Sequence, residues 1–270
     1  MRGRPLGWIA GSLLLSLAYG CRARGPVNPS LSITLDEAEI ALEEMAADPT
    51  PLDRPLIVLG GFIDPGLGPW WVGRRLRRLV SDPGRILEIS YATCCTIREC
   101  RERTIAAVDA AFASDDPDWT TEVDVVGLSL GGVIAREACA PAPAGSTSRR
   151  RLRVARIFSL SSPHRGASLA GAPLVHPLQE DLRPASDLVR RLDDEYRTAT
   201  YELFAYVRLG DFWIGPENAA PFGETPWWLS NGLFNSAHDM GCIDVRAHAD
   251  IARRLRSEAP YATRPPAPIP

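Results

Sequence analysis

One short segment, Gly127-Leu128-Ser129-Leu130-Gly131-Gly132, constrains the fold more than any other part of the chain. The β-branched run before it, residues 123–126, predicts a buried parallel strand, and residues 133–139 after it predict a helix. A serine raised on a sharp turn between strand and helix has backbone close on both sides, so a Cβ at Gly127 or Gly131 would collide. The segment therefore predicts a strand–turn–helix unit that presents Ser129 together with free backbone N–H groups at the helix start.

The rest of the chain alternates predicted strands and helices. Further strands are expected over residues 55–59, 85–91, 153–160 and 203–209, and further helices over residues 35–47, 70–80, 101–112 and 244–257. Strands separated by helices along the whole length predict an α/β fold with a mostly parallel sheet and helices on both faces. Ligands of such sheets lie beyond the carboxyl ends of the strands, where Phe62, Ser129, His164 and Asp211 follow their strands.

The N-terminal residues predict a targeting segment. Arg2 and Arg4 precede the apolar run 8–19, which is too short to span a bilayer comfortably. The run ends in Leu-Ala-Tyr-Gly-Cys, which resembles the lipobox of bacterial lipoproteins, with Cys21 as the residue that would carry lipid. An ordinary secretory signal cleaved nearby is the alternative. Both interpretations place the mature protein outside the cytoplasm, and the first anchors it in the cell envelope, in the outer membrane because no aspartate follows Cys21.

The composition limits the classes of partner. The chain has 270 residues, of which 45% are hydrophobic and 23% charged, as expected for a globular protein with one sizeable core. A net charge of -3 gives no reason to expect a nucleic-acid partner.

The cysteines permit disulfides in an exported chain but do not predict a metal site. Five follow the signal: Cys94, Cys95, Cys100, Cys139 and Cys242. A small loop could be closed between Cys94 or Cys95 and Cys100, and a second pair could form between Cys139 and Cys242. No C-x₂-C pair has a matching second half, so we expect no metal.

A serine nucleophile needs a base within hydrogen-bond reach and an acid that orients the base. Of the four histidines, His248 falls inside the last predicted helix, where we expect it on the surface, and His176 lies in an irregular stretch. His164 directly follows a strand and is one candidate base. His238 lies in a loop of small residues before the last helix, from which it could reach the serine.

Four segments together resemble bacterial lipases and esterases of the α/β-hydrolase superfamily, of the triacylglycerol-lipase type. They are residues 127–132, the Ser-Pro-His-Arg-Gly of 162–166, residues 208–216 and the His-Asp-Met-Gly of 238–241. The resemblance covers residues 55–256 and preserves the superfamily's order of serine, acid and histidine. It implies Ser129 as nucleophile, Asp211 as acid and His238 as base. The remaining candidates are His164 as base and Asp187, Asp193 or Asp194 as acid.

The resemblance also implies an oxyanion hole built from two backbone N–H groups. One belongs to Leu130, directly after the nucleophile, and the other to the loop that follows the 55–59 strand. That loop usually carries His-Gly in the family, whereas this chain has Gly60-Gly61, which makes Phe62 the expected donor.

Apolar segments near this edge suggest how a substrate is held. Residues 166–200 could form a small cap over the site, as in similar lipases. Six aromatic residues could form an acyl pocket or a lipid-facing rim, although we expect at least half of them to pack in the core: Trp70, Trp71, Phe212, Trp213, Trp227 and Trp228.

The expected organisation is a signal peptide at 1–20, a linker and helix at 21–54, an α/β-hydrolase domain at 55–264 and a flexible tail at 265–270. The expected function is hydrolysis of carboxylic esters of lipids or other apolar acyl groups, with no cofactor. The same residues would serve an acyltransferase or thioesterase. A non-catalytic, membrane-anchored binding protein of the same fold is the alternative from another class.

Overall fold

The computed structural model describes residues 31–143, 145–146, 148–168, 176–231 and 237–265. The expected signal, Cys21 and residues 266–270 of the expected tail lie outside the described residues, as do residues 169–175 of the expected cap.

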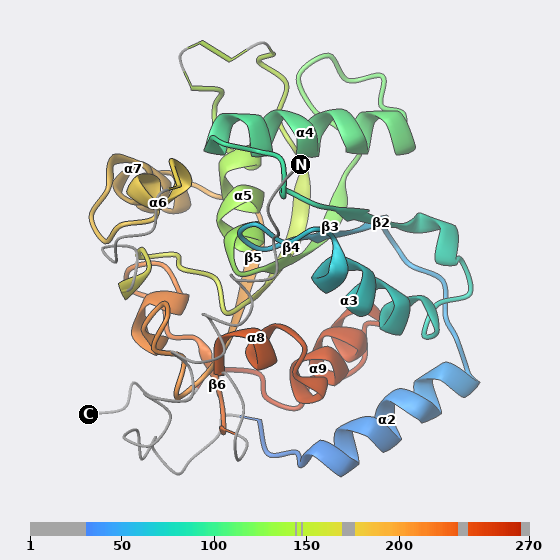
Figure 1. Cartoon of the computed structure of the whole chain (residues 1–270). Coiled ribbons are helices and arrows are strands. Elements are labelled where there is room, and N and C mark those ends of the chain that lie inside the picture. Colours follow the sequence, from blue (N-terminus) through green and yellow to red (C-terminus); the bar gives the residue numbers. More distant parts are fainter. Residues whose placement is uncertain (1–30, 144, 147, 169–175, 232–236, 266–270) are drawn as a thin grey trace, which may run out of the picture.

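A parallel six-stranded sheet forms the centre of the molecule, in the order β2-β1-β3-β4-β5-β6 (Figure 1). Its strands are β1 (Leu56–Leu59), β2 (Ile86–Ile89), β3 (Val123–Leu128), β4 (Val154–Leu160), β5 (Glu202–Arg208) and β6 (Trp227–Leu229). The predicted α/β class with a mostly parallel sheet is confirmed. The first five strands fall within one or two residues of the expected ranges, whereas β6 was not predicted.

Helices cover both faces of this sheet, as predicted. They are α2 (Leu35–Ala47), α3 (Leu67–Arg77), α4 (Ile97–Ala111), α5 (Leu130–Cys139), α6 (Leu178–Asp181), α7 (Asp187–Tyr196), α8 (Ala237–Cys242) and α9 (Val245–Leu255). Figure 1 shows α4 and α5 on one face and α3, α8 and α9 on the other, with α2 outside α9. Capping boxes fix two of the helix starts: Thr34 and Glu37 begin α2, and Thr96 and Glu99 begin α4.

The two faces of the sheet bury separate hydrophobic layers because successive side chains of a strand point to opposite sides. In β1, Ile57 and Leu59 pack with α4 and α5, whereas Leu56 and Val58 pack with α2, α3 and α9. All four are fully buried, which is why β1 is a continuous apolar run rather than an alternating one.

The last helix, α9, is buried on more than one side because α2 packs against it from outside. His248 is completely buried, and the expectation that it lies on the surface was wrong. Arg75 donates a hydrogen bond to His248 Nδ1 (3.0 Å), and His248 Nε2–H donates to the carbonyl of Cys242 (3.2 Å). Burial and the charge of Arg75 lower the pKa of His248 to about 4.

The five described cysteines are free thiols. Cys94 and Cys100 lie within hydrogen-bond reach of each other, which agrees with the proximity expected for that pair. Cys139 is the last residue of α5, whereas Cys242 lies near Ser129 at the other end of that helix. A ten-residue helix separates the two by roughly 15 Å, so the proposed Cys139–Cys242 pair was wrong.

Candidate active site

The turn around Ser129 has the crowding that its glycines predict. Ser129 joins β3 to α5 with φ 48° and ψ -115°, a conformation that side-chain-bearing residues adopt rarely. A Cβ at Gly127 would lie 2.4 Å from the backbone nitrogen of Gly132, and one at Gly131 would lie 2.5 Å from the carbonyl oxygen of Leu59. Because backbone cannot move aside as a side chain can, these two positions require glycine.

Ser129, His238 and Asp211 lie together in a continuous hydrogen-bonded row. The Ser129 hydroxyl donates to His238 Nε2 at 3.0 Å, and His238 Nδ1–H donates to the two Asp211 carboxylate oxygens at 2.9 and 3.2 Å. An ionised carboxylate can only accept hydrogen bonds, so Asp211 fixes the proton of the neutral imidazole on Nδ1. The lone pair on Nε2 therefore faces the serine hydroxyl, as a general base requires.

Asp211 is held by the turn that follows β5. It is fully buried, its backbone N–H donates to the carbonyl of Arg208, and its own carbonyl accepts from Gly215 N–H. The N–H of Ile214 donates to one carboxylate oxygen at 3.4 Å. This turn aims the carboxylate at the histidine and excludes water from its far side.

His238 is the second residue of the short helix α8, and 15% of its side-chain surface remains exposed. Burial alone would lower its pKa, but the charge and hydrogen bond of Asp211, with a contribution from Asp239, raise the pKa above 6.5. Trp213 lies beside the imidazole, with ring centroids 6.3 Å apart.

The competing base, His164, lies elsewhere and makes different contacts. It is buried, it accepts from Arg136 at Nδ1 (3.3 Å), and its Nε2–H donates to the Ser159 hydroxyl (2.9 Å). Burial and the charges of Arg136 and Arg165 hold its pKa well below 6.5. Both ring nitrogens are therefore engaged in a neutral packing role.

The three competing acids lie on α7 rather than beside His238. Asp187 and Asp194 are exposed to solvent, and Asp193 forms an ion pair with Arg136 at 3.5 Å. The structure places none of these carboxylates in the hydrogen-bonded row with Ser129.

The two segments expected to supply the oxyanion donors lie next to the serine. Leu130 is the first residue of α5, so its N–H belongs to the turn that has no partner within the helix. On the other side, the loop after β1 passes so close that a Cβ on Gly61 would lie 3.4 Å from Ser129 Cβ. Phe62 follows in this loop, and its ring packs edge-on against His176 at 4.8 Å.

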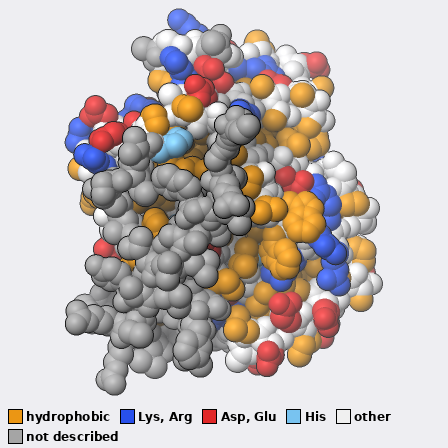
Figure 2. Space-filling model, viewed as in Figure 1, with side chains coloured by type: hydrophobic (Ala, Val, Ile, Leu, Met, Phe, Trp, Pro, Cys, Tyr) orange, Lys and Arg blue, Asp and Glu red, His pale blue; other side chains and the backbone are white. Residues whose placement is uncertain are grey.

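The six candidate aromatics separate into three groups. Trp227 and Trp228 are buried, Phe212 and Trp213 are half-buried beside the site, and Trp70 and Trp71 are exposed on α3. On the surface over α3, Figure 2 shows hydrophobic and basic side chains close together.

Several contacts at the site had no signal in the sequence. Asn231 accepts from the N–H of Gly210 (2.8 Å), and a Cβ on Gly210 would lie 2.5 Å from its side-chain nitrogen. This pair fixes the turn before Asp211. Gly210 belongs to the 208–216 segment, but Asn231 lies 21 residues later and outside every segment singled out in the sequence.

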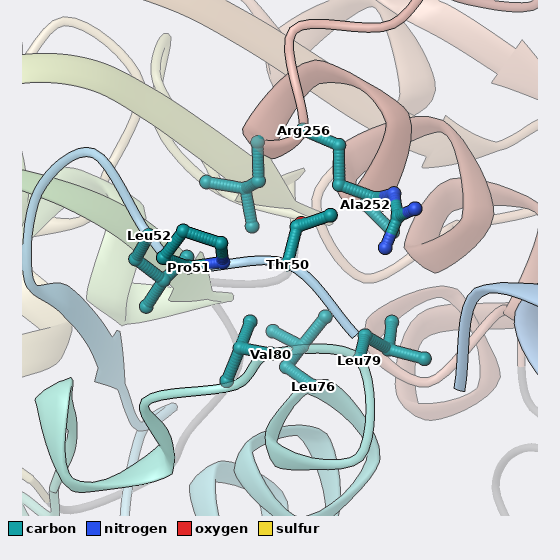
Figure 3. Close-up of a pocket in the computed structure, with 9 residues that line it drawn as sticks. Thr50, Pro51, Leu52, Leu76, Leu79, Val80, Ala252 and Arg256 are labelled. Atoms are coloured by element: carbon teal, nitrogen blue, oxygen red, sulfur yellow. The ribbon is translucent and has the colours of Figure 1, made fainter. Parts of the chain in front are cut away.

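A small hollow lies away from the triad, between the segment before β1, the end of α3 and α9 (Figure 3). It is lined mainly by apolar side chains: Thr50, Pro51, Leu52, Leu76, Leu79, Val80, Ala252, Leu255 and Arg256. A volume of about 10 Å³ is barely that of one water molecule, so this hollow holds no substrate.

Several solved structures are similar to this chain in fold. The lipase BlEst2 of Bacillus licheniformis in its mature form has a TM-score of 0.50 and 12% identity, over 72% of this chain and 89% of that one. The chain has the α/β-hydrolase fold. The product of the gene lin2722 of Listeria innocua has a TM-score of 0.48 and 10% identity, over 80% of this chain and 97% of its own.

Phospholipase PlaB of Legionella pneumophila has a TM-score of 0.46 and 13% identity, over 57% of this chain. The matched region is 39% of the phospholipase, so this chain spans about two-fifths of that protein's length. No protein-family model matches the sequence, and no curated protein matches it.

None of the helices in the described part of the chain has the length and apolar character that crossing a membrane requires. Within the same residues we found no group of three or more His, Cys, Asp or Glu side chains arranged to hold a metal ion.

Proposed function

We propose that this chain is a serine hydrolase that cleaves carboxylic esters through an acyl-enzyme on Ser129. The observation that carries the proposal is the row from the Ser129 hydroxyl to His238 (3.0 Å) and from His238 to Asp211 (2.9 Å). These distances lie within the range that proton transfer to a general base requires.

In the acylation step, Ser129 Oγ attacks the ester carbonyl carbon while its proton passes to His238 Nε2. Asp211 stabilises the imidazolium that results, because its carboxylate accepts from Nδ1–H. The tetrahedral intermediate carries a negative oxygen, for which the backbone N–H groups of Leu130 and Phe62 are the proposed donors. When the intermediate collapses, the C–O bond to the alcohol breaks and His238 returns the proton to the leaving oxygen.

Deacylation repeats the same transfers with water. His238 takes a proton from the water as it attacks the acyl carbon, and the second tetrahedral intermediate then expels Ser129 Oγ, which recovers the proton. Acylation and deacylation need no metal or organic cofactor, because the chain's own groups provide every proton transfer.

We propose esters of apolar acyl groups as the substrate class. Phe62 follows the glycines beside Ser129, and Trp213 lies beside the base, so aromatic side chains lie near both the nucleophile and the base. Apolar walls with a few convergent polar groups are typical of sites for such ligands. In keeping with the lipobox resemblance, we also propose that the protein is exported and anchored in the cell envelope through lipid on Cys21.

Labelling with a fluorophosphonate probe tests the hydrolase proposal directly. The wild-type chain should be labelled and should hydrolyse nitrophenyl esters, and Ser129→Ala should lose both properties, with turnover falling by on the order of 10⁴ to 10⁶. Ser148→Ala, an exposed serine outside the site, is the matched control. A wild-type chain that neither reacts with the probe nor hydrolyses any ester of a chain-length panel would instead favour the non-catalytic binding protein.

A further inference from the structure

The outward side of α3 is unusually apolar for a helix on the surface of a globular domain. Leu67 is 69% exposed, Trp70 47% and Trp71 46%, and Ile63 in the loop just before the helix is 51% exposed. The inward side of the same helix is buried against β1 and β2, so the exposed tryptophans are not needed for the core.

Ile63 has an unfavourable backbone conformation in addition to its exposure. Its φ of 56° lies in the left-handed region, which a β-branched residue rarely adopts. The neighbouring Asp64 holds the segment in place, because its carboxylate accepts from the N–H groups of Gly66 (2.8 Å) and Gly68 (3.1 Å) at the start of α3. The loop is thus fixed in a form that presents an apolar side chain to solvent.

Basic side chains lie on the same outward side of α3, toward its C-terminal end. Arg74 and Arg78 are exposed and follow Leu67 and Trp71 at helical spacing, and the guanidinium of Arg74 lies 5.4 Å from the centre of the Trp70 ring. Neither arginine forms an ion pair with the described residues of the chain. The other two arginines of this stretch are engaged, since Arg75 contacts His248 and Arg77 pairs with Glu88.

We propose that this α3 face docks on the surface of a bilayer that contains anionic phospholipids, an inference that rests on the proposed hydrolysis of lipid esters. The face consists of Ile63, Leu67, Trp70, Trp71, Arg74 and Arg78. Tryptophan prefers the boundary between headgroups and acyl chains, where its ring is apolar and its N–H stays solvated. Arginines beside it match the negative charge of such a surface, and their stems extend along the apolar layer.

The position of the face relative to the nucleophile explains what docking would achieve. The loop that carries Ile63 begins at Gly60 and Gly61, and Gly61 lies against Ser129. At the start of α3, a Cβ on Gly68 would come within 3.1 Å of Leu128, the residue before the nucleophile. The start of α3 therefore lies close to the nucleophile, so docking of the α3 face would bring the bilayer near the site and give an ester in the facing leaflet a short path to Ser129.

Binding to vesicles tests the proposal without any turnover. The full chain carrying Ser129→Ala and Cys21→Ser, which can neither hydrolyse nor carry lipid, is floated with vesicles of phosphatidylcholine alone or mixed equally with phosphatidylglycerol. We expect binding to the mixed vesicles, weakened about tenfold or more by Trp70→Ala with Trp71→Ala. Phe222→Ala, which removes another exposed aromatic side chain, should leave binding unchanged.

Two more variants distinguish the contributions of charge and of apolar contact to vesicle binding, and exclude unfolding as the cause of a loss. Arg74→Gln with Arg78→Gln should weaken binding to the mixed vesicles by roughly thirtyfold and leave binding to phosphatidylcholine alone unchanged. Leu67→Glu should also weaken binding, while an acidic residue in the first turn favours the helix, so its loss of binding cannot be attributed to unfolding.

Equal vesicle binding by the double tryptophan variant and its parent would overturn the proposal. So would a dimer in sedimentation that the tryptophan substitutions dissociate while vesicles are not bound, because the face would then cover a second copy of the chain. Failure of the hydrolase proposal is distinguishable, since it would appear as absent ester hydrolysis in a chain that still binds vesicles. If both proposals hold, the ratio of activity on vesicle esters to activity on a soluble ester falls in the tryptophan variant and not in Phe222→Ala.

Discussion

Arg208 and Asp244 form a buried salt bridge, with 2.8 Å between guanidinium Nη2 and carboxylate Oδ2. Arg208 ends β5, and its carbonyl accepts from the N–H of Asp211, so it belongs to the turn that carries the acid. Asp244 caps α9, directly after the helix that carries His238. The pair therefore connects the acid's strand to the histidine's helix, and Arg246 adds a second guanidinium to the same carboxylate.

Asp244→Asn should lower the free energy of unfolding by about 3 kcal/mol or more, because it leaves two buried guanidinium groups without a full counter-charge. Burial opposes ionisation, but the hydrogen bonds and charges of Arg246 and Arg208 hold the pKa of Asp244 below 3.8. This contribution is therefore present above about pH 4 and is lost as the pH falls through the lowered pKa. Urea denaturation at neutral pH measures the change. The control is Asp187→Asn, which removes the carboxylate that pairs with Arg190 on the exposed surface and should change the free energy of unfolding by less than about 0.5 kcal/mol. Equal effects of the two substitutions would contradict the role of Asp244.

Gly131→Ala should impair both stability and ester hydrolysis. The added Cβ would meet the carbonyl oxygens of Leu59 and Gly60, so the start of α5 and the loop after β1 must move apart. We expect a loss of about 1–3 kcal/mol in stability, and a fall in kcat/KM of on the order of a hundredfold because the oxyanion donors separate. Gly84→Ala is the control, since a Cβ there meets nothing within 4 Å. Normal hydrolysis by Gly131→Ala would show that this crowding is not needed for the site.

The Ser129 turn could be predicted because its signal is local: a β-branched strand, a glycine-flanked serine and a helix follow one another within residues 123–139. No local signal distinguishes Asp211 from Asp193, and that choice depended on the resemblance to lipases. The structure separates the two, since Asp211 reaches His238 and Asp193 pairs with Arg136.

Elements that are held in place by residues distant in the sequence were also missed, because they too have no local signal. The strand β6 has three residues and its hydrogen bonds come from β5, as in the contact between Leu209 N–H and the carbonyl of Leu229. The helix α8 has six residues, too few for a periodic pattern. The burial of His248 depends on tertiary contacts of α9, among them the one with Arg75 of α3, which lies far away in the sequence.

His238→Ala and His164→Ala should affect different properties. Without His238 no base reaches Ser129, so kcat should fall by on the order of 10⁴ or more with little change in stability. Without His164 the buried guanidinium of Arg136 and the hydroxyl of Ser159 each lose a partner, which should cost about 1–3 kcal/mol of stability. Turnover and thermal melts of both variants separate the two roles. A His164→Ala chain that folds normally but cannot be acylated would make His164 the base.

Lipid on Cys21 should make membrane association resistant to salt. Each buried CH₂ of an acyl chain contributes about 0.8 kcal/mol, whereas contacts of Arg74 and Arg78 with anionic lipid weaken as salt rises. Expressed with its own signal, the wild-type chain should stay in the membrane fraction after a high-salt wash and should incorporate an alkyne-labelled fatty acid. Cys21→Ser should lose the label, and the exposed Cys95→Ser should keep it. Mature wild-type protein in the soluble fraction would reject lipidation.

The pH dependence of kcat/KM should follow the neutral form of His238. Its pKa is raised above 6.5, so the rate should climb with a midpoint above pH 6.5 and stay high on the alkaline side. Asp211→Asn removes the main group that raises this pKa and leaves burial, which lowers it. The midpoint should therefore move to lower pH, while the rate falls by on the order of 10⁴ because the amide no longer fixes the Nδ1–H tautomer.

Asp239→Asn provides the intermediate case for the same measurement. Asp239 is exposed and raises the pKa of His238 through charge alone, without a hydrogen bond to the ring. Its removal should shift the midpoint slightly to lower pH and leave the maximal rate close to that of wild type, because the Ser129–His238–Asp211 row is untouched. Profiles from about pH 5 to about pH 9 on a short soluble ester would show both shifts. A flat wild-type profile, or a midpoint in Asp211→Asn that stays at the wild-type value, would mean that the titrating group is not His238 paired with Asp211.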